Sequence, residues 1–360
     1  ALATKLKRLF TNYAMKTYNQ LKEISDSFFK KCSDIASTKS WAVCVAMHEY
    51  ALNTYPDDPH ITIASDICPT ERLFLVTSEL ILFLEQVEKL SCYPVSCNPI
   101  VKAEEVKEET GEVYGRLWSK FSDTELIDNT AENLAERLAL NDFDLKYFKG
   151  KNAIDIGCGS GRFTIALRKL GCESVIGVDY GGDGLKVANK AIEEFQIQGV
   201  SFRKTDVLHL PFEDEIFDFV FCNGVLHHTE DMELGIKEMI RVAKKGAKMW
   251  LYLYGDGGIF WYARKEMPKV MQKIQQTYTI SMLDMIGMPS NKFIFCDNWY
   301  VPIERHTTDA EAREIINRFG VSDIRRLEKG RTTDLECSSI NGGEVGKTMW
   351  GDGELRYIIE

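Results

Sequence analysis

The sequence lacks two features that would each fix a broad class of protein. Its 360 residues carry 44 Lys and Arg against 54 Asp and Glu, which gives a net charge of −10. Nucleic-acid backbones are bound by clustered basic side chains, so we expect no nucleic-acid partner. The longest apolar stretch, Leu73 to Leu84, is interrupted by Thr77, Ser78 and Glu79. It is too short to cross a bilayer, so we expect no membrane span.

Metal-type cysteine patterns are also missing. Ten cysteines occur, and Cys92 and Cys97 have no second pair at the distance typical of a zinc finger. Cys158 and Cys222 lie in apolar surroundings, which predicts small buried side chains. We therefore interpret the cysteines as free thiols in a reducing compartment, expect no metal, and expect a cytoplasmic location.

The N-terminal third has helical periodicity. Apolar residues recur at Leu21, Ile24 and Phe28, and further helices are predicted at about 40–54 and 70–90. Residues 1–100 therefore predict an all-helical domain, which closes a pocket, forms a homodimer contact or docks a partner. Residues 101–150 predict a charged linker followed by a helix at 125–140.

From residue 151 onward, short apolar runs alternate with helical segments. The runs predict strands at 153–156, 174–178, 200–204, 217–222 and 248–254, and a last strand at 355–359. This alternation is typical of an α/β protein with a mostly parallel, Rossmann-like sheet and helices on both faces. Residues 151–360 are thus expected to form one domain.

The most informative segment is a glycine-rich turn after the first of these strands. Gly157, Gly159 and Gly161 follow the spacing G-x-G-x-G, whereas a dinucleotide-binding turn needs G-x-G-x-x-G. Asp155 precedes the turn, where its charge would repel a pyrophosphate and suits a cationic ligand. Asp179 ends the second strand, and a carboxylate there can accept hydrogen bonds from the hydroxyls of a ribose.

The segment Asp155-Ile-Gly-Cys-Gly-Ser-Gly161 resembles the first motif of class I S-adenosylmethionine-dependent methyltransferases, and the resemblance extends over about residues 112–330. It implies S-adenosylmethionine as cofactor and S-adenosylhomocysteine as product. An aromatic segment that precedes the 125–140 helix folds over the cofactor in related enzymes. The implied cofactor site comprises Asp155, Gly157, Cys158, Gly159, Gly161, Asp179, Tyr180, Asp206, Val207, Asn223, Tyr114 and Trp118.

Two of these assignments have structural alternatives. Asp206 is expected to meet the adenine amino group, but an acid at this place also caps helices. Tyr114 and Trp118 either cover the cofactor or simply pack the two domains together.

Candidate catalytic residues follow the fourth strand. His227 and His228 lie beside the expected position of the methyl group, and histidine titrates near neutrality, so either could act as a base. Alternatively, they orient their loop through backbone hydrogen bonds. Tyr254 and His306 are further catalytic candidates.

About fifty residues separate the fifth strand from the helix that begins near Thr308, far more than an ordinary connection. We interpret residues 255–306 as a cover over the substrate, because ligands bind beyond the carboxyl ends of parallel strands. Alternatively, this segment is a helical pair that only buries the edge of the sheet. Its candidate substrate-binding residues are Trp261, Tyr262, Trp299, Tyr300 and Arg305.

The absence of two motifs limits the classes of acceptor that the sequence predicts. Methylases of exocyclic base amines carry Asn/Asp-Pro-Pro-Tyr after the fourth strand, and pyrimidine carbon methylases use Pro-Cys; neither occurs here. The Leu226-His-His228 loop resembles the quinone-biosynthesis and secondary-metabolite branch. We therefore expect methyl transfer to oxygen, nitrogen or carbon of a small molecule. The alternatives are a peptide or protein acceptor docked by residues 1–100, and a noncatalytic scaffold that keeps the cofactor fold.

Overall fold

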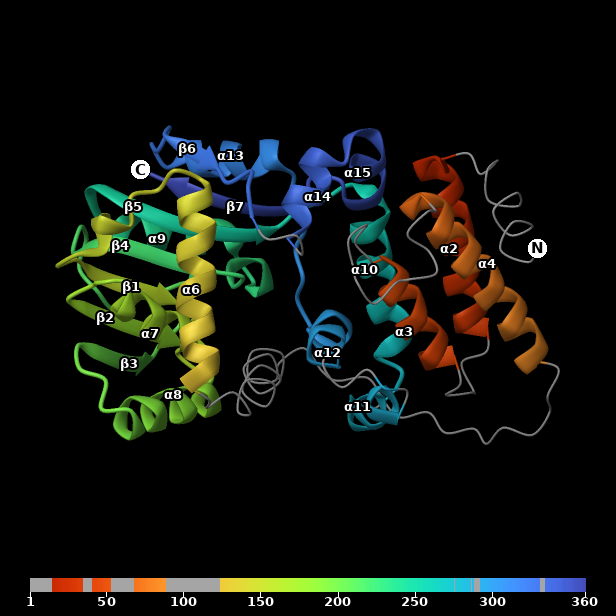
Figure 1. Ribbon diagram of the computed structural model, residues 1–360, viewed down its shortest axis with the longest axis horizontal. Helices are drawn as coiled ribbons and strands as arrows, with labels where there is room; N and C mark the ends of the chain where they lie inside the picture. The colour runs from red at the N-terminus through yellow and green to blue at the C-terminus, as the bar shows by residue number, and fades with distance from the viewer. Residues whose placement is uncertain are drawn as a thin grey trace, which may run out of the picture. The chain divides into compact units, whose positions relative to one another are not determined.

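The computed structural model describes residues 15–34, 41–52, 68–88, 124–274, 276–285, 287, 292–330 and 334–360 (Figure 1). The chain divides into two compact units, and each is built from three separate stretches. The first unit comprises residues 1–100, 256–300 and 332–353, and the second comprises residues 101–255, 301–331 and 354–360. Tyr114 and Trp118 lie outside the described residues.

The second unit is organised around a seven-stranded sheet in the order β3-β2-β1-β4-β5-β7-β6 (Figure 1). Strands β1 to β5 are parallel to one another, β7 runs antiparallel to β5, and β6 runs antiparallel to β7. The predicted Rossmann-like, mostly parallel sheet is thus confirmed. The strands are β1 (Asn152–Ile156), β2 (Ser174–Asp179), β3 (Val200–Lys204), β4 (Phe217–Asn223), β5 (Ala243–Tyr254), β6 (Ile324–Arg326) and β7 (Glu354–Ile359).

Helices cover both faces of this sheet. On one face, α9 and α13 bury apolar side chains against Ile154 and Ile156 of β1; on the other, α6 and α7 pack against Ala153 and its neighbours. This alternation follows from the two-residue period of a strand, which sends successive side chains to opposite faces. The helices are α6 (Thr124–Leu140), η2 (Leu145–Phe148), α7 (Arg162–Lys169), α8 (Gly182–Glu194), η3 (Leu226–His228), α9 (Met232–Val242) and α13 (Asp309–Arg318).

The fifth strand starts earlier than its sequence pattern predicts. It begins at Ala243 rather than 248, because Ala243 pairs with Phe217 while Lys248 pairs with Phe219. The extra residues between them form an irregularity in the ladder, where Gly246 has a φ of +72°. Such a bulge breaks the apolar alternation that marks a regular strand.

Arg241 of α9 fixes the connection that leads from β3 into β4. Its guanidinium donates to both carboxylate oxygens of Glu238, at 2.7 and 2.8 Å, and to Asp214 at 2.8 Å. It also donates to the carbonyl oxygens of Leu210 and Phe212. The connection is therefore held by one planar, fork-shaped donor group.

We expect Arg241→Ala to lower the free energy of unfolding by about 2–4 kcal/mol, since several charge-assisted hydrogen bonds are lost together. Arg241→Lys should restore only part of this stability, because an ammonium group cannot donate in the same fork. Denaturant unfolding measures both changes. A loss below about 0.5 kcal/mol in Arg241→Ala, the range of ordinary surface substitutions, would show that the network contributes little.

The first unit is helical in its described part. Helix α2 packs against α4 and α10, α3 packs against α4, and α10 also contacts α12 and α15. The predicted helical character of the N-terminal region is confirmed. None of the described helices is long and apolar enough to cross a membrane. The helices are α2 (Tyr18–Asp34), α3 (Trp41–Leu52), α4 (Pro69–Glu88), α10 (Gly258–Met271), α11 (Gln276–Met285), α12 (Lys292–Tyr300), α14 (Leu335–Asn341) and α15 (Gly343–Trp350).

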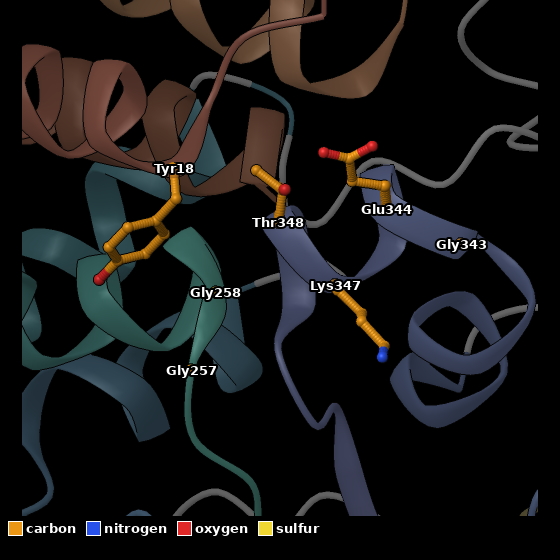
Figure 2. Close-up of a pocket in the computed structure, with 7 residues that line it drawn as sticks. All are labelled: Tyr18, Gly257, Gly258, Gly343, Glu344, Lys347 and Thr348. Atoms are coloured by element: carbon orange, nitrogen blue, oxygen red, sulfur yellow. The ribbon is translucent and has the colours of Figure 1, made fainter.

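A pocket of about 720 Å³ lies in this unit where α2, α10 and α15 begin. Figure 2 shows Tyr18 on one side of it and Glu344, Lys347 and Thr348 of α15 on the other. Glu344 and Lys347 are both exposed, so the pocket carries one acid and one base at its rim.

Candidate active site

The turn that follows β1 depends on glycine. Gly157, Gly159 and Gly161 have φ values of +74°, +54° and +80°, a region that other residues rarely adopt. The amide of Gly157 donates to the carbonyl of Val178 at 2.8 Å, which ties the turn to β2. A methyl group added at Gly157 would lie 2.3 Å from a methyl carbon of Val225. The turn therefore passes directly over the loop that follows β4.

Asp179, the last residue of β2, binds this turn. Its Oδ2 accepts a hydrogen bond from the Gly159 amide at 2.8 Å, and its Oδ1 accepts one from the Gly181 amide at 2.7 Å. Burial raises the pKa of Asp179, and the two amide donors oppose that rise. A carboxylate offers about four lone-pair sites, so these amides leave acceptor capacity for ligand hydroxyls.

Asp155 is buried beneath the turn. Its Oδ2 accepts a hydrogen bond from the Thr164 hydroxyl at 2.6 Å, which joins β1 to α7. Burial, together with the nearby charge of Asp179, raises the pKa of Asp155 to about 7. A cation bound near the turn would favour the ionised form, because opposite charges stabilise each other in a site of low dielectric constant.

The titration of Asp155 should make the free energy of unfolding depend on pH. Between about pH 4 and pH 7 an unfolded chain has released the Asp155 proton while the folded chain keeps it, so stability falls as the pH rises through that range. Asp155→Asn keeps an oxygen acceptor for Thr164 and removes the titration. We expect it to be more stable than the unchanged protein at pH 8 by about 2–4 kcal/mol, with the difference shrinking toward pH 4. Urea unfolding of both proteins across this range measures the difference, and a constant difference would contradict the expectation.

The other cofactor candidates lie in varied surroundings. Tyr180 is more than one-third exposed, with the Lys204 ammonium 5.4 Å from its ring centre. Asp206 accepts a hydrogen bond from the Leu208 amide at 2.9 Å, so it stabilises its own turn. Asn223 accepts a hydrogen bond from the Trp250 indole at 2.9 Å. Val207 and Cys158 are buried.

The two histidines of η3 differ in their surroundings. His227 is fully buried, stacks on the Tyr254 ring with centres 3.8 Å apart, and its Nδ1 accepts a hydrogen bond from the Tyr254 amide at 3.3 Å. His228 places Nδ1 2.8 Å from the carbonyl oxygen of Ile303. A carbonyl can only accept, so Nδ1 of His228 carries the proton and Nε2 of the neutral ring carries the lone pair. His227 is thus fixed inside the loop, whereas the ring of His228 is oriented by the carbonyl of Ile303.

The chain that follows residue 300 completes this cluster. His306 Nε2 lies 2.8 Å from Glu304 Oε1, and both side chains are largely buried. The ring centres of His306 and Tyr254 are 6.4 Å apart. The backbone amide of Arg305 donates to the carbonyl of His227 at 2.8 Å. The structure therefore brings His227, His228, Tyr254, Arg305 and His306 together at the carboxyl edge of the sheet.

The remaining substrate candidates belong to the first unit. The Trp261 indole donates to the carbonyl of Trp350 at 3.0 Å, and the Tyr262 hydroxyl bonds to Asp26. Trp299 is buried against Phe295, and the Tyr300 hydroxyl bonds to Thr279 at 2.6 Å. These contacts give each ring a packing or bonding role within the helices of that unit.

Three residues of the site's surroundings were not predicted. Tyr252 bonds to Glu354, and Arg356 pairs with Glu354 and lies over the Tyr252 ring. The spacing of Tyr252 and Tyr254, two residues apart on one strand, predicts a shared face. Nothing in the pattern connects that face with residues about a hundred positions later in the chain.

Comparison with known proteins gives consistent matches. Residues 147–306 match the family model described as a methyltransferase domain. Demethylmenaquinone methyltransferase from Bacillus cereus is 35% identical over 28% of this chain and 43% of its own length. The same enzyme from Alkalihalophilus pseudofirmus is 29% identical over 41% of this chain and 68% of its own length. A solved S-adenosylmethionine-dependent methyltransferase from Thermotoga maritima has a TM-score of 0.43 and 17% identity, covering 69% of this chain and 98% of that one. The chain thus spans less than half of the Bacillus cereus relative.

The stretch 147–306 therefore contains the core of a class I S-adenosylmethionine-dependent methyltransferase, and S-adenosylmethionine is its cofactor. Within this class, the matching curated relatives are enzymes of the quinone-biosynthesis branch.

The described residues fit this cofactor. The turn can pack closely against Val225 because Gly157 lacks a Cβ, which would collide with that side chain. Two carboxyl groups lie beside it: that of Asp155 is buried, and that of Asp179 is partly buried. Such a site suits a ligand that carries positive charge together with ribose hydroxyls.

Proposed function

We propose that the protein transfers the methyl group of S-adenosylmethionine to an oxygen, nitrogen or carbon atom of a small-molecule acceptor. The observation that carries this proposal is the carboxylate of Asp179, held by the amides of Gly159 and Gly181 at the carboxyl edge of the sheet. Ligands of open α/β sheets bind at this edge, where the strand order reverses between β1 and β4. The cluster of histidine and tyrosine rings follows the neighbouring strands β4 and β5.

Different residues of the chain would bind the cofactor and align the reactants. Asp179 binds the ribose hydroxyls, the glycine turn admits the amino-acid end of the cofactor, and Asp155 contributes negative charge below it. When bound, the cofactor supplies an electrophilic methyl group on a positively charged sulfur. Burial of His227 and Tyr254 limits water around the reacting atoms, and alignment of the reactants is the main contribution to the rate.

A hydroxyl or protonated amine acceptor must lose a proton before its lone pair can react. We assign this step to His228, because its Nδ1 is held by Ile303 and the lone pair of its neutral ring lies on Nε2. His306 is the second candidate, with its Nε2 held by Glu304. We assign to His227 a supporting role, because the Tyr254 ring and amide hold it inside the loop.

His228→Ala should lower the turnover number about 10²-fold, which is the usual effect of losing a general base. The affinity for S-adenosylmethionine should stay within about threefold of that of the unchanged protein. His227→Ala should instead lower stability. Turnover at saturating cofactor, measured for both variants, separates the two roles. Unchanged turnover in His228→Ala would move the assignment to His306.

The acceptor is best sought by transfer of label. The protein is incubated with methyl-labelled S-adenosylmethionine and either a demethylated menaquinol or a cell extract, and small molecules are separated from macromolecules. The quinol is the first probe because the matching relatives are named demethylmenaquinone methyltransferases. Label in a small molecule supports the proposal, and label in protein or peptide favours a docked macromolecular acceptor instead. Absence of label with every acceptor, together with measurable cofactor binding, would favour a noncatalytic scaffold.

A further inference from the structure

The side chains of Tyr252, Glu354 and Arg356 form a network beside the candidate active site. The hydroxyl of Tyr252 donates to Glu354 Oε1 at 2.5 Å, and Arg356 Nη2 lies 2.9 Å from Glu354 Oε2. The Arg356 guanidinium lies over the Tyr252 ring, 4.4 Å from its centre. Burial and the Glu354 charge raise the pKa of Tyr252 well above its ordinary value, so the phenol stays protonated and donates. Each member of the network thus holds the other two.

The register of the sheet connects this network with the glycine turn. Tyr252 pairs with Asn223 of β4 on one side and with Arg356 of β7 on the other. Cys222, the residue before Asn223, pairs with Ile156, which directly precedes Gly157. The row that joins Asn223, Tyr252 and Arg356 therefore lies one residue nearer the carboxyl edge of the sheet than the row of Ile156 and Cys222.

Tyr252 also supports the loop that follows β4. The amide of Gly224 donates to the Tyr252 carbonyl at 3.3 Å. A methyl group added at Gly224 would lie 3.3 Å from two carbon atoms of the Tyr252 ring, so the glycine rests on that ring. His227 meets the same ring edge-on, with centres 5.9 Å apart. The loop 223–228 is thus packed against the ring of Tyr252.

We infer that Tyr252, Glu354 and Arg356 are positioning residues, which hold the loop 223–228 in the geometry that methyl transfer needs. The inference rests on the proposed function, because that loop carries His228. Glu354 and Arg356 fix the plane of the Tyr252 ring, and the ring fixes Gly224 and His227. A small displacement of a reacting group lowers the rate strongly, so support of this kind affects turnover more than cofactor affinity.

The protein contains its own control for this network. On the opposite face of the sheet, the hydroxyl of Tyr357 bonds to Asp309 Oδ1 at 2.7 Å, and Arg313 Nε bonds to Asp309 Oδ2 at 3.0 Å. The Arg313 guanidinium lies 5.7 Å from the Tyr357 ring centre. This second tyrosine, carboxylate and arginine set joins β7 to α13 and lies among the apolar side chains of that face. It has the same chemistry, and its hydrogen bonds join β7 to α13, whereas the Tyr252 ring and carbonyl meet the loop 223–228.

The test compares Tyr252→Phe with Tyr357→Phe, since each removes one buried hydroxyl that bonds to a carboxylate. We expect both to lower the unfolding midpoint by a similar amount. Only Tyr252→Phe should lower turnover, about tenfold, with the KM for S-adenosylmethionine unchanged within about threefold. Only Tyr252→Phe should also shift the NMR signals of the Gly224 amide and the His227 ring, measured in protein saturated with S-adenosylhomocysteine.

The NMR comparison needs no acceptor, so it decides the inference even where the proposed function fails. If neither variant shifts the two signals, or if both shift them equally, the network only joins strands and the inference is overturned. Shifted signals with unchanged turnover on an identified acceptor would overturn it as well. Glu354→Gln provides a second comparison, because it keeps an oxygen acceptor for Tyr252 and weakens the pair with Arg356; it should shift the same signals by less than Tyr252→Phe does.

Discussion

Replacing Asp179 with alanine is expected to raise the dissociation constant for S-adenosylmethionine by about 10²–10⁴-fold. Two charge-assisted hydrogen bonds to the ribose, each worth about 1.5–3 kcal/mol, would be lost. The substitution also frees the Gly159 and Gly181 amides that donate to Asp179, so the turn loses one of its bonds to β2 and keeps the bond from the Gly157 amide to the Val178 carbonyl. Calorimetric titration with the cofactor measures the change.

Asp183→Ala is the matched control for this experiment. Asp183 lies four residues further along the chain, at the start of α8, is largely exposed, and pairs with Lys186 at 2.8 Å. It carries the same charge and forms an exposed ion pair with Lys186, so we expect its loss to change the affinity less than about threefold, as for an ordinary surface ion pair. Equal affinities in the Asp179 and Asp183 variants would show that the ribose binds elsewhere.

Replacing Gly157 with alanine is expected to destabilise the cofactor turn by about 2–5 kcal/mol and to abolish measurable cofactor binding. The new methyl group would lie 2.3 Å from Val225, and the residue has a φ of +74°. Left-handed backbone costs a side-chain-bearing residue about 1–2 kcal/mol, and overpacking costs about 1–3 kcal/mol more. Thermal unfolding and a cofactor titration measure the two consequences.

Gly150 separates these two causes. Its φ is +72°, and a methyl group added there would meet nothing within 4 Å. Gly150→Ala should therefore show the backbone cost alone. Combining Gly157→Ala with Val225→Ala, which removes the colliding methyl groups, should restore part of the stability. If Gly150→Ala is as damaging as Gly157→Ala, the contact with Val225 is unimportant.

Most of the sheet could be predicted from the sequence because its strands are local patterns. Strands β1, β2 and β4 are short, largely buried apolar runs, whereas β3 is mostly exposed. The predicted positions of all four strands agree with the structure to within one residue at each end. Strand β6 could not be found in this way. It contains only Ile324, Arg325 and Arg326, and its conformation comes from pairing with β7.

The candidate cofactor site could be proposed from the sequence for a similar reason. Asp155 and the glycine turn lie within seven residues of each other, and Asp179 ends the next strand. The roles of the histidines depend instead on partners distant in sequence. Ile303 holds His228, and the amide of Arg305 holds the loop through His227, so only the folded chain distinguishes an oriented ring from an enclosed one.

The network of Tyr252, Glu354 and Arg356 could not be predicted either, because it also depends on contacts between residues distant in sequence. Tyr252 lies about a hundred positions before the other two residues, and the three meet because β7 inserts between β5 and β6. Periodicity predicts that a strand exists at the end of the chain, but it does not say which strand will be its neighbour.

The interleaved course of the chain has a consequence for dissecting the protein genetically. The chain passes between the two units after residues 100, 255, 300, 331 and 353. No uninterrupted fragment can therefore contain the whole of either unit without parts of the other. Truncation at any of these points divides at least one hydrophobic core, so an isolated catalytic fragment must be obtained by joining separate stretches with short linkers.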